Sequence, residues 1–298
     1  MMQKLFSLLV AIMAAVASVS ADSTLINLPL KKNRLSEGLR FCEGSVVYSN
    51  SLLVSNFGTK KLDPLNNEGK GYIVKTDGVK SEVFIPADGN LSAPKGMAVS
   101  DDYLFIADVG KVVIYNLKNK TAKPQVIVMP EGDLFVNDIV VADKWAYISV
   151  TNTGKIYKLD ISTPNALSAT KLSVYTSVPG ANGLVVDGRR MFVASYPADG
   201  NTTNDHVIYL IADRSVPKPQ KFIMRKGQYD GLALYKNKLY FTNWVNNEIG
   251  YVDIMTKTVK LIALDGFKLT GPADISVWRD KLYIPNLPSS EVIVFPLK

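Results

Sequence analysis

The chain has 298 residues, of which 47% are hydrophobic and 20% charged, and this composition excludes a disordered protein. Its formal net charge is +7, which allows adhesion to acidic surfaces. The basic residues are nevertheless scattered through expected turns and do not alternate with aromatic residues, so no nucleic-acid-binding surface is expected.

The first residues resemble a secretory signal peptide, which we assign to residues 1–21. Lys4 gives a positive start, a run from Leu5 to Ala17 is apolar apart from Ser7, and small residues lead to Ala21. The run is shorter than the roughly 20 residues that a membrane-spanning helix needs, and no later segment is long enough, so no membrane span is predicted. We therefore expect a secreted or periplasmic protein whose residues 22–298 form a single domain.

Six sequence-related units follow the signal segment, and each opens with a polar residue followed by an alternating apolar strand. The openings are CEGSVVYSNSLLVSNF with Glu43, PKGMAVSDDYLFIADV with Lys95, VNDIVVADKWAYISVT with Asn137, ANGLVVDGRRMFVASY with Asn182, YDGLALYKNKLYFTNW with Asp230 and PADISVWRDKLYIPNL with Asp274. The period-two alternation and the richness in Val, Ile, Tyr and Phe predict two antiparallel strands at each opening.

Third and fourth strands complete most units. GKVVIYNL (110–117) and GKIYKLD (154–160) are examples of a third strand, and AKPQVIVM (122–129) is a more polar fourth strand. Four strands per unit and a period of about 40 to 50 residues are typical of a propeller. The sequence therefore predicts an all-β protein, a six-bladed β-propeller, rather than a β-sandwich.

The last unit ends after its third strand, EVIVFPL (291–297), and lacks an outer strand. Residues 23–30 (STLINLPL) form a spare strand near the N-terminus. We expect this N-terminal strand to pair with residues 291–297 and close the last blade, which removes an open sheet edge. The single cysteine, Cys42, excludes an intramolecular disulfide, and we interpret it as a small buried residue rather than a catalytic thiol.

The six opening residues are predicted to face one another, because the first strand of each propeller blade lines the central channel. They comprise three carboxylates, two amides and one ammonium group, which leaves an excess of two negative charges. A divalent cation would balance this excess, and oxygen donors without usable His or Cys favour Ca²⁺ or Mg²⁺. A wide ring favours the larger ion, Ca²⁺. The alternative is that Lys95 forms ion pairs with the acids and the ring holds no metal.

Four dipeptides at these openings resemble those of the gluconolactonase, senescence-marker-protein and paraoxonase superfamily. They are Glu43-Gly44, Asn137-Asp138, Asn182-Gly183 and Asp230-Gly231. The resemblance implies a six-bladed propeller with a central Ca²⁺ bound by Glu43, Asn182 and Asp230. It implies that Asn137 contacts the metal, directly or through water, and also the substrate, and that Asp138 supports the site.

The chain departs from that superfamily at three positions. Phe135 stands where gluconolactonase-like members carry an arginine that holds the sugar acid, so specificity for sugar lactones is not expected. The only histidine, His206, lies in an expected loop, and we interpret it as a solvated residue, with a proton shuttle as the alternative. Lys95 is unexpected beside a cation; either it points away from the metal or it binds an anionic substrate.

These residues suggest a Ca²⁺-dependent hydrolase that acts on a small-molecule lactone or related ester. Either Glu43 or Asp230 would take a proton from the attacking water, or Asp230 would attack directly, while Asn137 would orient the substrate. Tyr196, Trp244 and Phe57 would form apolar walls or pack between blades, and Lys95, Phe135, Asp138 and Asp274 would complete the pocket. The competing hypothesis is a non-catalytic binding platform with a structural or absent metal.

Overall fold

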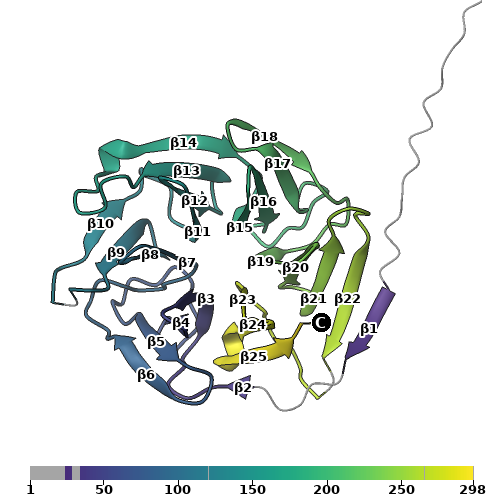
Figure 1. Cartoon of the computed structure of the whole chain (residues 1–298), viewed down its shortest axis with the longest axis horizontal. Helices are drawn as coiled ribbons and strands as arrows, with labels where there is room; N and C mark the ends of the chain where they lie inside the picture. Colours follow the sequence, from purple (N-terminus) through teal and green to yellow (C-terminus); the bar gives the residue numbers. More distant parts are fainter. Residues whose placement is uncertain (1–23, 29–33, 120, 265, 298) are drawn as a thin grey trace, which may run out of the picture.

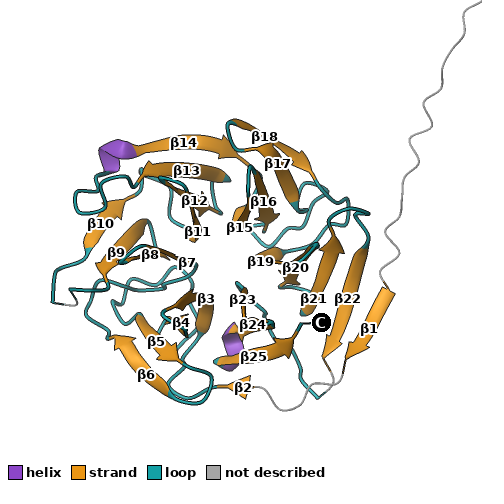
Figure 2. Ribbon diagram, in the orientation of Figure 1, coloured by secondary structure: helices purple, strands orange, loops and turns teal. Residues whose placement is uncertain are grey.

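The computed structural model describes residues 34–119, 121–264 and 266–297 together with the backbone of residues 24–28, so the predicted signal peptide lies outside the described residues. Six β-sheets are arranged in a ring around a common axis (Figure 1). Apart from strands and loops, the described residues contain two short 3-10 turns (Figure 2), at Ala169–Lys171 and Leu287–Ser289. The predicted all-β, six-bladed propeller is confirmed.

Each blade is formed by strands that are consecutive in the sequence, except where the N-terminal segment joins. Blade one contains β3 (Cys42–Tyr48), β4 (Ser51–Asn56), β5 (Tyr72–Thr76) and β6 (Ser81–Ile85). Blade two contains β7 (Met97–Ser100), β8 (Tyr103–Asp108), β9 (Lys111–Asn116) and β10 (Gln125–Val128). Blade three contains β11 (Val136–Ala142), β12 (Trp145–Val150), β13 (Lys155–Asp160) and β14 (Leu172–Ser177).

The second half of the ring follows the same plan. Blade four contains β15 (Ala181–Asp187), β16 (Arg190–Ser195), β17 (Tyr209–Asp213) and β18 (Val216–Lys221). Blade five contains β19 (Tyr229–Tyr235), β20 (Lys238–Asn243), β21 (Glu248–Asp253) and β22 (Val259–Leu264), with β1 (Thr24–Leu28) as a fifth strand. Blade six contains β23 (Ser276–Trp278), β24 (Lys281–Asn286), β25 (Glu291–Pro296) and β2 (Arg34–Leu35).

The apolar side chains of the strands pack between neighbouring blades. Phe105 of β8 shares one cluster with Ile148 of β12, and Phe192 of β16 shares another with Phe241 of β20. Each such fully buried side chain contributes about 1.5–3 kcal/mol. Cys42 belongs to the cluster between blades one and six, where its thiol donates a hydrogen bond to the Glu291 carbonyl (3.2 Å), and burial raises its pKa. Its interpretation as a buried residue is confirmed.

An N-terminal strand closes the last blade, as predicted, but it is not the predicted segment. Arg34 and Leu35 of β2 pair antiparallel with β25, and Arg34 Nε lies 2.7 Å from Glu291 Oε2. The expectation that residues 23–30 pair with 291–297 is wrong: β1 runs parallel to β22 at the edge of blade five (Figure 1). The reason is the length of the connection: the strand that closes blade six must lie directly before β3, the innermost strand of blade one, and β2 is that strand.

No helix in the described part of the chain is long and apolar enough to cross a membrane.

Two truncations will separate the contributions of β1 and β2. A chain that starts at Arg34 keeps β2 and loses β1, whereas a chain that starts at Ser36 loses both. We expect the second truncation to lower the melting temperature far more than the first, because β2 is the outer strand that completes the sheet of blade six, whereas β1 is an additional fifth strand of blade five. Thermal unfolding followed by circular dichroism measures the difference. Equal melting temperatures for the two truncations would contradict this role for β2.

Candidate active site

The four dipeptides that opened four of the units each lie in a β-bulge. The pairing of β3 with β4 shifts between Cys42 and Ser45, so one extra residue is inserted at Glu43-Gly44. The same shift occurs in β11, β15 and β19, at Asn137-Asp138, Asn182-Gly183 and Asp230-Gly231. A bulge interrupts the strand ladder and redirects a side chain. The motif residues are therefore removed from regular pairing at the same end of four innermost strands.

Hydroxyl groups of the neighbouring second strands hold three of these bulges in place. They accept hydrogen bonds from bulge N–H groups in the pairs Gly44 N to Ser55 Oγ (2.8 Å), Asp138 N to Ser149 Oγ (3.0 Å) and Gly231 N to Thr242 Oγ1 (2.8 Å). The sequence analysis did not single out these hydroxyl residues. The available signal was a Ser or Thr at the same place in the second strand of three units: SLLVSN, WAYISV and KLYFTN.

The second residue of each motif sits where consecutive innermost strands approach closely. A Cβ on Gly183 would lie 2.1 Å from the Asp230 carbonyl oxygen, so only glycine fits there. In blade three the corresponding residue is Asp138. Its Oδ2 accepts a hydrogen bond from Leu184 N (2.6 Å) and its Oδ1 one from Ile139 N (2.7 Å). Asp138 therefore joins blade three to blade four, as a support for the site.

One pocket of about 90 Å³ gathers most of the predicted site residues. Its lining consists of Glu43, Phe57, Leu62, Pro64, Lys95, Phe135, Asn137, Asn182, Tyr196, Asp230, Trp244 and Leu287. All four predicted metal ligands and the predicted aromatic walls are thus brought together. Leu62 and Pro64 come from the long loop of blade one (residues 59–71), which the sequence predicts to shape the pocket, and Leu287, which was not predicted, comes from the 3-10 turn Leu287–Ser289.

Four buried oxygens in this pocket have no hydrogen-bond partner. They are Glu43 Oε2, Asn137 Oδ1, Asn182 Oδ1 and Asp230 Oδ1, and they are the only such side-chain atoms among the described residues. A buried unpaired polar atom costs about 1–3 kcal/mol, so four together indicate a missing partner. The described residues contain no group of three His, Cys, Asp or Glu side chains that could hold a metal ion. The four oxygens do not form such a group because two of them belong to asparagine amides. Two carboxylates and two amide oxygens suit a hard divalent cation such as Ca²⁺.

The same burial makes the carboxylates hard to ionise without such a cation. Burial, with repulsion from Asp138, raises the pKa of Asp230 to about 7, while Lys95 opposes the shift. Burial and then the charge of Asp230 raise the pKa of Glu43 well above its usual range. The charge of Asp230 also affects the neighbouring Tyr196: burial and this charge raise the pKa of the Tyr196 hydroxyl to about 12.

Lys95 does not neutralise these acids through a direct ion pair. Its side chain is 1% exposed, and its Nζ donates a hydrogen bond to the Ala93 carbonyl at 2.9 Å. Among the described residues, no carboxylate lies within salt-bridge distance of Nζ, so the expected ion pairs between Lys95 and the acids are not observed. Burial lowers the pKa of Lys95, and Glu43 is the strongest influence in the opposite direction.

Two predicted pocket residues and the single histidine lie outside the pocket lining. Asp138 has the supporting role described above, and burial raises the pKa of its carboxyl to about 7. Asp274 is buried, and its Oδ1 accepts a hydrogen bond from Ile275 N (2.9 Å); burial and then the charge of Asp138 raise its pKa. His206 remains in its loop, where Nδ1 accepts a hydrogen bond from Thr203 N at 2.9 Å.

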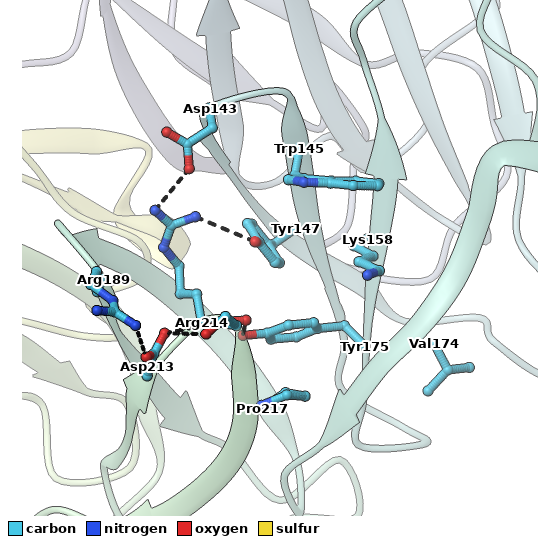
Figure 3. A pocket seen from close by; sticks show the side chains of 11 residues that line it. Asp143, Trp145, Tyr147, Lys158, Val174, Tyr175, Arg189, Asp213, Arg214 and Pro217 are labelled. Atoms are coloured by element: carbon cyan, nitrogen blue, oxygen red, sulfur yellow. Dashed lines mark hydrogen bonds and ion pairs between the residues drawn. The ribbon is translucent and has the colours of Figure 1, made fainter.

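A larger pocket of about 390 Å³ lies between blades three and four (Figure 3). It is lined by residues such as Asp143, Trp145 and Arg214. Asn137 lies at the start of β11 and Asp143 follows its end, so the two positions are about 20 Å apart along the strand. Arg214 is paired with Asp143 (3.0 Å), and Arg189 is paired with Asp213. Because its arginines are already paired and none of the four unpartnered oxygens lies there, we place the candidate active site in the smaller pocket.

Comparison with known proteins supports the fold but no particular family. No protein-family profile matches the chain, and no curated protein matches it. A chain in the crystal structure of a nidogen/laminin complex is 13% identical, with a TM-score of 0.54 over 74% of this chain and 84% of that one. The computationally designed protein Ika8 is 12% identical, with a TM-score of 0.49 over 86% of this chain and 71% of that one. At such identities, the likeness concerns the fold alone.

Proposed function

We propose that the protein is a secreted, calcium-dependent hydrolase of the gluconolactonase-like type that acts on a lactone or related ester. The observation that carries the proposal is the set of four unpartnered buried oxygens, contributed by Glu43, Asn137, Asn182 and Asp230 from four different blades. The proposed reaction, hydrolysis of a lactone or ester, is supported by the resemblance of the four bulge motifs to that superfamily. The proposed secretion is supported by the signal-like segment at residues 1–21.

The four oxygens are the atoms that would hold the cation. When bound, a divalent cation supplies a Lewis acid that polarises a carbonyl oxygen. Asn137 and Asn182 fix the position of the reacting carbonyl through their amides. Glu43 or Asp230 accepts the proton of the attacking water, or Asp230 attacks as the nucleophile. Phe57, Tyr196 and Trp244 exclude bulk water from the rest of the pocket, which strengthens these electrostatic interactions.

The proposal is tested by measuring the turnover of γ-butyrolactone, aryl lactones and phenyl acetate, either with one equivalent of calcium per protein or with excess EDTA. We expect hydrolysis with calcium, its loss with EDTA, and its recovery when calcium is added back. Calcium titration by calorimetry on the EDTA-treated protein gives an independent measure of one tight site. Calcium binding without hydrolysis of any of these esters would overturn the enzymatic function and favour a binding propeller with a structural ion.

A further inference from the structure

Lys95 is the one charged pocket residue for which the proposed hydrolysis has no role. Its side chain lines the pocket beside Glu43 and Asp230, yet it is 1% exposed. Burying an ammonium group is costly unless it is paired and hydrogen-bonded. A lysine ammonium has three donors, and within the described residues only one of them has an acceptor, the Ala93 carbonyl. Two N–H groups are therefore left for a ligand.

The surroundings of Lys95 hold its ammonium group in place without neutralising it. Nζ lies 5.6 Å from the centre of the Phe57 ring and 5.2 Å from the centre of the Phe135 ring. Such cation–π contacts compensate part of the lost hydration but leave the positive charge in the pocket. Phe135 therefore contributes its ring to a cation, Lys95, that comes from the neighbouring blade.

The charges of the pocket lining then specify the ligand. Glu43 and Asp230 are the carboxylates of the lining and Lys95 is its cation, so these three side chains and a bound divalent ion sum to one positive charge, while Asp138 and Asp274 are buried outside the lining. This balance suits a single negative charge better than a doubly charged phosphate. The volume of about 90 Å³ and walls that include Trp244 and Leu287 suit a small, partly apolar molecule.

We propose that Lys95 binds the carboxylate of a small acidic substrate, whose reacting carbonyl lies at the four-oxygen cluster. The identity of the reacting bond rests on the proposed function, but the anion subsite does not. The expected ligand is thus a lactone or ester that carries one carboxylate. Lys95 acts as a specificity-determining residue, because a neutral carboxamide offers its two free N–H groups one uncharged carbonyl oxygen in place of the two charged oxygens of a carboxylate.

Binding is tested with two ring ketones that cannot be hydrolysed, 3-oxocyclopentanecarboxylate and its neutral carboxamide. Calorimetry with calcium present should show that the wild-type protein binds the carboxylate at least about tenfold more tightly than the carboxamide. Lys95→Met keeps the length and apolar stem of the side chain and should abolish this preference. Lys118→Met, which removes an exposed lysine of the same blade, is the matched control and should retain it.

Turnover gives the second readout, with 5-oxotetrahydrofuran-2-carboxylate and its carboxamide as the acidic and neutral lactones. Lys95→Met should lose the preference in kcat/KM for the acidic over the neutral lactone, whereas Lys118→Met should retain it. Equal wild-type affinity for the two ketones, or an unchanged preference in Lys95→Met, overturns the proposal. If Lys95→Met does not fold, the same measurements on Lys95→Gln, together with the wild-type preference for the carboxylate over the carboxamide, still test the proposal. A Lys95-dependent preference without calcium binding supports the anion subsite and overturns the hydrolase.

Discussion

Asp230→Asn is expected to weaken Ca²⁺ binding at least about 100-fold and to lower lactone or ester turnover roughly 10²- to 10³-fold. The substitution keeps the size of the side chain and one oxygen but removes a negative charge from the four-oxygen cluster. It also removes the group that would accept the proton of water or attack directly. Calcium titration by calorimetry and kcat/KM under calcium saturation measure the two effects.

A matched control is available on a neighbouring innermost strand. Asp187 ends β15, the strand that carries Asn182 at its other end, and Asp187 is paired with Arg190. Asp187→Asn makes the same chemical change far from the pocket, so both calcium affinity and turnover should stay within about twofold of wild type. Wild-type turnover in Asp230→Asn would show that Asp230 neither reacts nor holds the cation.

The fold could be predicted because its signals are local. Each blade repeats an alternating pattern and a tight turn, and these determine the antiparallel pairing of consecutive strands. The pairing of the N-terminal segment could not be predicted in this way. Residues 24–28 and Arg34–Leu35 both precede blade one, and composition favours the longer, more apolar segment as the closing strand. Its parallel position beside β22 depends on the tertiary path of the chain, which leaves only a short segment between blade six and β3.

The candidate site could be predicted to the extent that it depends on the bulge motifs. Glu43, Asn137, Asn182 and Asp230 stand at equivalent positions of the repeat, so their convergence follows from the propeller itself. The individual pocket residues outside the strands, such as Leu62 in a loop and Leu287 in a 3-10 turn, have no repeat or periodicity that would mark them. The groups that the Lys95 side chain contacts could not be predicted from the sequence either. The repeat places its backbone in the ring, but the side chain extends toward Ala93 and two phenyl rings rather than to a carboxylate.

The stability of the metal-free protein is expected to fall as the pH rises from about 4 to about 7. Burial raises the pKa of Asp230 and of Asp138 from 3.8 to about 7, and it raises those of Glu43 and Asp274 in the same direction. In this window the folded protein binds more protons than the unfolded chain, so the free energy of unfolding decreases with increasing pH. Below about pH 4 both states are protonated at these groups and the dependence vanishes.

Calcium should reverse this dependence, because it binds the ionised carboxylates. At a hundredfold excess over its Kd, a ligand that binds only the folded state adds about 2.7 kcal/mol, or roughly 5–10 °C in melting temperature for a domain of this size. The gain should be full above about pH 7 and should disappear toward pH 4, where protons occupy Glu43 and Asp230. Asp230→Asn should reduce both the calcium gain and the pH dependence of the metal-free protein. A wild-type melting temperature at pH 8 that is the same in calcium and in EDTA would mean that the four unpartnered oxygens do not form a calcium site.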